Sequence, residues 1–150
     1  MTLLRKFAAR SWADKVLLVR AFSLVCTVRL GLSVLPYRTV QRLVGYSVLP
    51  HRDDAGSPEH ERSSQRRVVN SVEAVGRRLL GNKPCLTQAL VAQRLMRQRG
   101  YDSVLRIGVA KDGGELLAHA WLERGGRVII GGGASPVRYK PLAPVQSGAA

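Results

Sequence analysis

The spacing of apolar and polar positions changes once along this chain, near Gly100. Before that residue, apolar side chains recur at helical spacing, as Val68, Val72, Val75 and Leu79 do in steps of four, three and four. After it, apolar and polar residues alternate in short runs that glycine-rich turns separate. The pattern therefore predicts an α+β fold, with helices first and an antiparallel sheet after them.

The first 50 residues predict helices. Residues 16–35 form an apolar run long enough to span a bilayer. Arg20 and Arg29 lie inside this run and, at about 100° per residue, point to opposite sides of a helix. Each arginine costs about 2.5–3.5 kcal/mol near a bilayer centre. We therefore favour a packed helix or helix pair over a surface-bound amphipathic helix, and place a true span last. Membrane contact is not the favoured interpretation.

Prolines and polar residues divide the chain. Pro36 interrupts the first helical region, and residues 38–49 predict a further short helix. Residues 51–58 read as a polar linker. We accordingly expect an N-terminal helical region (1–50), the linker, and a core (59–150), together forming one folded unit.

Start and stop signals are clear within the core. Ser57 and Pro58 have the residue types of an N-cap and a first helical position. The sequence GNKP at 81–84 ends that helix and starts a second, which carries Cys85 in its first turn and ends before Gly100. A three-stranded meander is predicted at residues 103–110, 115–123 and 128–130. After the third strand the chain is expected to loosen.

Composition restricts the classes of function. The two cysteines, Cys26 and Cys85, are no disulfide framework, which favours a reducing compartment over a disulfide between them. No metal site or other cofactor is expected, because CxxC is missing and His51, His60 and His119 lack ligand spacing. The net charge is +14, which indicates either an acidic partner or simply a basic solvated surface. With aromatics at only 5%, nucleic acid is not an expected partner.

Two residues carry candidate chemistry. Cys85 lies at a predicted helix N-terminus, where the helix dipole and free N–H groups favour a thiolate. The same N–H groups, with Asn82 as a helper, could hold an oxyanion. His119 lies in the predicted second strand and could act as the base, and Trp121 shares its face and could shield it or line a cleft. The structural alternatives are a buried cysteine, a core histidine and a packing tryptophan.

Residues 85–132 resemble the peptidase domain of the lasso peptide B protein, within the transglutaminase-like superfamily. Four motifs carry this resemblance: CL at 85–86, RG at 99–100, IGV at 107–109 and AHAW at 118–121. The resemblance implies a transglutaminase-like (papain-like) core, in which a central helix with cysteine at its N-terminus packs on an antiparallel sheet. It also implies that Cys85 is the nucleophile and His119 its base.

The same resemblance implies a function. Such an enzyme is a cytoplasmic cysteine peptidase that removes the leader peptide from a ribosomally made precursor. It then passes the core peptide to an ATP-using lasso cyclase. Nothing in the sequence resembles a leader-recognition domain, so a split form with a separate leader-recognition protein is expected. The alternatives are another transglutaminase-fold amidase, or a non-catalytic or partner-completed scaffold that presents the precursor.

The sequence departs from the family pattern at the third catalytic position. If Gly125 and Gly126 form a two-residue turn, His119 faces Gly132 on the next strand, where an acid is expected. Only glycines stand there, from Gly131 onward. Glu123 is no substitute, because four strand steps carry it roughly 13 Å from His119. The third member of the triad is therefore left unassigned, and the residues predict a Cys–His dyad, whose imidazole a backbone carbonyl or a water molecule could orient instead.

Overall fold

The computed structural model describes residues 11–45, 57–81, 85–132 and 135–142. The elements are α2 (Trp12–Val34), α3 (Tyr37–Gly45), α4 (Pro58–Leu79), α5 (Cys85–Arg97), β1 (Val104–Asp112), β2 (Glu115–Arg124), β3 (Arg127–Ile130), α6 (Ser135–Arg138) and β4 (Lys140–Pro141). The strands form one antiparallel sheet in the order β3-β2-β1-β4. This arrangement confirms the predicted α+β class.

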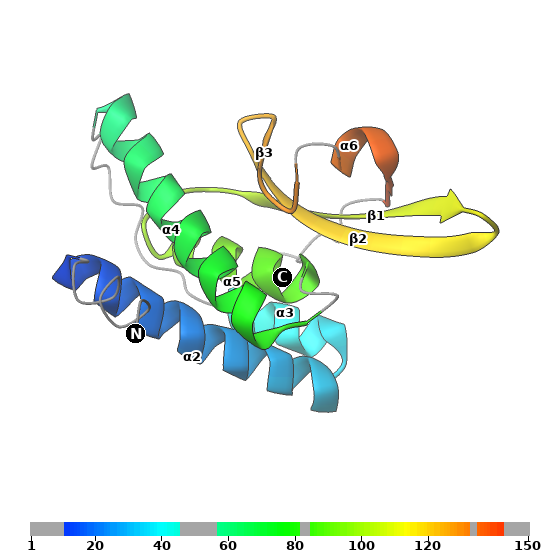
Figure 1. Cartoon of the computed structure of the whole chain (residues 1–150), viewed down its shortest axis with the longest axis horizontal. Coiled ribbons are helices and arrows are strands. Elements are labelled where there is room, and N and C mark those ends of the chain that lie inside the picture. The colour runs from blue at the N-terminus through cyan, green and yellow to red at the C-terminus, as the bar shows by residue number, and fades with distance from the viewer. Residues whose placement is uncertain (1–10, 46–56, 82–84, 133–134, 143–150) are drawn as a thin grey trace.

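Helices cover the sheet unequally (Figure 1). Helices α2, α3, α4 and α5 lie together on one side of the sheet, and the short α6 lies on the other. Helix α5 is central, since it packs against β2 and also against α2 and α4. A helix surrounded in this way must be apolar on more than one face, as its sequence is.

Helix α4 begins as its sequence predicts. The side chain of Ser57 accepts a hydrogen bond from the backbone N–H of His60 at 3.4 Å, and Pro58 is the first helical residue. Within the helix Val68, Val72 and Val75 are buried. The cap thus fixes where α4 begins, and the apolar stripe determines which of its faces packs against the core.

Helix α2 contains most of the long apolar run. Its residues Leu17, Ala21, Val25 and Val28 are buried against α4 and α5. By length and composition it could cross a membrane, and only 28% of its most apolar window is buried within the fold. One face of α2 is therefore a packed helix face, as predicted, and the opposite face needs its own explanation.

One hydrophobic core joins the helices to the sheet. Leu90, Leu95 and Met96 of α5 have no exposed surface, and they share this core with Leu122 of β2 and Ile130 of β3. The same core includes α2 residues, so side chains from both sides of the predicted linker are buried together. The predicted linker falls mostly outside the described residues.

Paired glycines make the two hairpin turns. Gly113 and Gly114 join β1 to β2, and Gly125 and Gly126 join β2 to β3, all with positive φ. Glycine adopts this left-handed conformation without a Cβ penalty, which suits the two-residue turns of twisted hairpins. Both predicted turns are confirmed.

The register predicted for β3 is wrong beyond its first two residues. Arg124 pairs with Arg127 as expected, but Leu122 pairs with Ile130, because the ladder shifts between Leu122 and Glu123. One extra residue in a strand is a β-bulge, which bends the strand and re-aims the side chains beyond it. The pairing of His119 with Gly132, which was predicted by counting residues outward from the turn, therefore does not hold.

The chain after β3 does not loosen as predicted. It forms α6 and then β4, which pairs with the free edge of β1 through Val109 with Lys140 and Gly108 with Pro141. Proline is tolerated on such an edge strand, where its missing N–H leaves no central ladder bond unmade. The local signal for so short a strand was too weak to predict it.

We predict that Leu90→Ala lowers the free energy of unfolding by about 2–5 kcal/mol, because it leaves a cavity in a fully buried site. Urea unfolding followed by circular dichroism measures this. The matched control is Leu116→Ala, at an exposed position of β2, with an expected change within about 0.5 kcal/mol. Equal losses in both variants would show that α5 does not organise the core.

Candidate functional site

Cys85 is the first residue of α5 and is half-buried. The helix behind it is held rigidly, because Ala89 and Leu90 have no exposed surface. The thiol therefore sits at the N-terminal end of a helix whose position the core fixes. Asn82, the predicted oxyanion helper, lies outside the described residues.

His119 lies in β2, is half-buried and pairs across the ladder with Gly108 of β1. Its Nε2 atom is 2.6 Å from the carbonyl oxygen of Gly131. Since a carbonyl oxygen only accepts, Nε2 must carry the proton in this bond. In the neutral imidazole Nδ1 is then left with a lone pair that can take a proton.

Gly131 occupies the region where the family pattern led us to expect an acid. Its φ is +103°, and an added Cβ would come within 2.6 Å of the Cβ of Trp121. No L side chain fits this backbone without displacement. The bulge in β3 and this conformation turn the main-chain carbonyl toward the imidazole, which is one of the two orienting groups that the sequence had left open.

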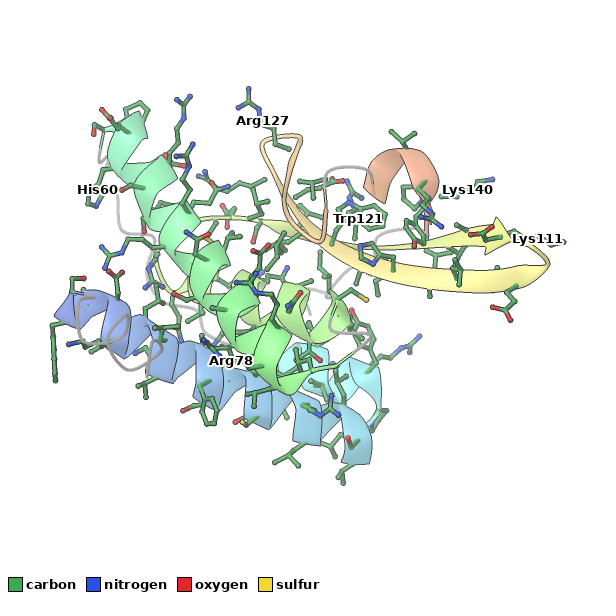
Figure 2. The ribbon with its side chains drawn as sticks, in the orientation of Figure 1. His60, Arg78, Lys111, Trp121, Arg127 and Lys140 are labelled. Atoms are coloured by element: carbon green, nitrogen blue, oxygen red, sulfur yellow. The ribbon has the colours of Figure 1, made fainter. Side chains whose placement is uncertain are left out.

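Trp121 lies beside the same imidazole on the same face of β2. Its ring is fully buried and nearly parallel to that of His119, with 6.2 Å between centroids. Its indole N–H donates to Glu123 at 2.7 Å, and Glu123 forms an ion pair with Arg106. Figure 2 shows Trp121 on β2, near β3 and α6. The tryptophan is thus locked and restrains the histidine ring.

Tyr139 is a neighbour of the imidazole that the sequence did not suggest. Its ring centroid is 4.9 Å from that of His119. It reaches this place because α6 and β4 return the chain to the edge of β1. Gly108 makes room for it, since a Cβ there would lie 2.8 Å from the Trp121 ring and 2.9 Å from the Cβ of Tyr139. The glycine of the IGV motif therefore has a packing role.

The structure does not bring Cys85 and His119 into contact. Within the described ranges Cys85 has no hydrogen-bond partner, His119 included. Strand alternation directs His119 to the face of β2 opposite Leu122, and Leu122 belongs to the core shared with the helices. The roles predicted for the two residues as nucleophile and base stay predictions.

The arrangement has the parts of an acyl-transfer site. It holds a thiol at a helix N-terminus, backbone N–H groups able to stabilise an oxyanion, and an imidazole with one nitrogen anchored. No group of three or more His, Cys, Asp or Glu side chains in the described ranges could hold a metal ion. A thiol at a helix N-terminus and an anchored imidazole are the groups that nucleophilic catalysis by sulfur needs, provided that the two can meet.

Comparison with known proteins identifies the family. Neither the curated proteins nor the solved structures contain a match. The family model described as the transglutaminase-like superfamily matches residues 18–144, which is most of the chain and includes Cys85, His119 and Tyr139. The chain therefore belongs to the transglutaminase-like superfamily.

Proposed function

We propose that this protein is a cysteine peptidase that removes the leader peptide from a ribosomally synthesised lasso peptide precursor. It acts in the cytoplasm with a separate leader-recognition protein and passes the product to a cyclase. The observation that carries the proposal is the order of parts: Cys85 begins α5, α5 packs on β2, and β2 carries an anchored His119.

Family membership supports the general chemistry. The transglutaminase-like superfamily includes cysteine peptidases and amidases. The narrower substrate class rests on the motifs at 85–86, 99–100, 107–109 and 118–121, which resemble the lasso peptide B protein.

In the proposed reaction, Nδ1 of His119 takes the proton of the Cys85 thiol and the thiolate attacks the scissile carbonyl carbon. Backbone N–H groups at the start of α5 hold the resulting oxyanion. The C–N bond breaks as His119 returns the proton to the leaving amine, which leaves a thioester on Cys85. Water, deprotonated by His119, then attacks the thioester, releases the carboxylic acid and restores the thiol.

In this scheme the carbonyl of Gly131 takes over the orienting role of the acidic residue in a catalytic triad. This carbonyl fixes the tautomer and the ring orientation of His119. A neutral carbonyl stabilises the imidazolium less than a carboxylate does, so the dyad relies more on correct positioning.

The placement of His119 on the face of β2 away from the helical core favours an enzyme that is inactive until a partner completes it. Catalytic hydrogen bonds are often long or unformed before substrate binds. We propose that the precursor and the leader-recognition protein together bring Cys85 and His119 within reach. A non-catalytic scaffold that only presents the precursor is the second candidate, favoured by the same placement of His119.

We predict that Cys85→Ala abolishes leader removal in a mixture of the protein, its recognition partner and the precursor, as followed by mass spectrometry. Cys26→Ala is the matched control and should cleave like the wild type, because Cys26 lies in α2, away from the sheet. Cleavage by the Cys85 variant would end the thiol-peptidase proposal. If the wild type releases no leader fragment, the scaffold candidate replaces it.

A disulfide trap tests the approach of the two residues. In a Cys26→Ala background, His119→Cys should form a disulfide with Cys85 under oxidation when precursor and recognition protein are present, since bridging needs Cα atoms within about 7 Å. Ala118→Cys, on the other face of β2, is the control. A bridge from position 118 alone, or from neither position, would contradict a Cys85–His119 dyad.

We predict that Gly131→Ala lowers kcat about 10²-fold, because displacing the carbonyl by about 1 Å misplaces the imidazole. The matched control is Gly113→Ala, which also introduces a side chain at positive φ but has no atom within 4 Å of the added Cβ. Steady-state kinetics and thermal unfolding measure both variants. A folded Gly131→Ala protein with unchanged kcat would show that the carbonyl does not position His119.

A further inference from the structure

The outer face of α2 exposes large apolar side chains towards both ends of the helix, with the exposed Ser23 and Thr27 between the two groups. Trp12 is 80% exposed, Val19 60% and Leu30 67%. These three residues lie within about 20° of one another around the helix axis, and Val34 continues the line at the far end. From Trp12 to Val34 the stripe extends about 33 Å, at 1.5 Å per residue.

The composition of α2 makes this face unusual. A helix that is apolar all round is normally covered on every side, by protein or by lipid. The core covers only the face that carries Leu17, Ala21, Val25 and Val28. Large exposed apolar patches on soluble proteins mark interaction sites. The outer face therefore requires a second apolar environment.

A pocket lies beside this face, between α2 and α4. Its volume is about 290 Å³. The lining is apolar except for one arginine, and consists of Leu18, Val19, Phe22, Val75, Arg78 and Leu79. Figure 2 shows Arg78 near the end of α4 beside α2. An apolar chain with an anionic group beside it fits a pocket of this kind.

The charges beside the stripe are positive. Arg20 and Arg29 are exposed and lie about 80° and 100° to either side of the line through Trp12 and Leu30. The acidic residue of α2, Asp14, is engaged in an ion pair with Arg67 of α4. The apolar stripe is thus flanked by cationic groups on both sides.

We propose that the outer face of α2 docks onto the surface of a membrane that contains anionic lipid. The helix would lie in the plane of the interface, with its apolar stripe in the acyl boundary. Arg20 and Arg29 point to opposite sides, which disfavours a span but suits this orientation, because both guanidinium groups can reach headgroup phosphates. The proposal is independent of the proposed peptidase activity.

Charge argues against a second copy of the chain as the occupant. Two such faces would bring together two molecules of net charge +14, and the arginines beside the stripe would find no acidic partner across it. An acidic protein helix could fill the pocket between α2 and α4. A convex stripe that runs from Trp12 to Val34 is better matched by a lipid surface, which adapts to it.

Docking through α2 would leave the candidate site accessible. Figure 1 shows α2 on the side of the molecule away from the sheet, with α4 and α5 between them. His119 on β2 would then face the aqueous side, where a soluble precursor could reach it.

Vesicle flotation of the full chain tests the proposal. The wild type should float with vesicles of equimolar phosphatidylcholine and phosphatidylglycerol, and less with phosphatidylcholine alone. Leu30→Glu should weaken binding about tenfold, because burial of one leucine is lost and an anion is added. Leu116→Glu is the matched control: position 116 is 73% exposed, on the far hairpin, and binding should stay within about twofold.

Tryptophan fluorescence provides a measurement on the unaltered protein. Trp121 is already fully buried, whereas Trp12 is exposed, so an emission blue-shift on adding anionic vesicles reports Trp12 entering the interface. Trp12→Phe should remove the shift and keep flotation.

Three results would overturn the proposal. The first is a wild type that does not float with anionic vesicles. The second is attraction by net charge alone. It would appear as equal weakening of vesicle binding by Leu30→Glu and Leu116→Glu, or as flotation of the wild type without a Trp12 emission shift. The third is self-association, seen by sedimentation and lost in Leu30→Glu without vesicle binding, which would assign the face to a contact between copies.

Discussion

The structure depends on the burial of α5 on all its sides at once. Its apolar residues contact the sheet through β2 and the other helices through α2 and α4. Because Leu90, Leu95 and Met96 have no exposed surface, the helix cannot shift without opening the core. That constraint fixes where the N-terminus of α5 lies, and therefore where the Cys85 thiol is presented.

The imidazole is positioned by main chain and packing more than by charge. A bulge in β3 and the left-handed backbone of Gly131 aim a carbonyl at His119, while Trp121 and Tyr139 confine the ring. Gly108 and Gly131 matter here because a Cβ at either place would meet the Trp121 side chain. In this member of the transglutaminase-like superfamily, glycines thus supply a geometry that an acidic side chain would otherwise be expected to supply.

Helix α2 illustrates how one apolar run can serve two purposes. One face completes the core with Leu17, Ala21, Val25 and Val28, and the other remains apolar and exposed beside arginines. The two faces explain why the run looks like a membrane segment by composition although the helix is packed within a folded domain. A peripheral contact with lipid would satisfy both properties without a span.

The sequence by itself determined the features that depend on neighbouring residues. These are the Ser57 cap, the glycine turns of both hairpins, the helix that begins at Cys85 and, through the order of these elements, the α+β class. These depend on residues a few positions apart, so a short pattern contains them. The bulge in β3, the carbonyl of Gly131 beside His119, the arrival of Tyr139 through β4 and the uncovered face of α2 depend on contacts between distant segments. Only the tertiary structure decided those, because a backbone group or a helix face has no sequence signature until its neighbours are in place.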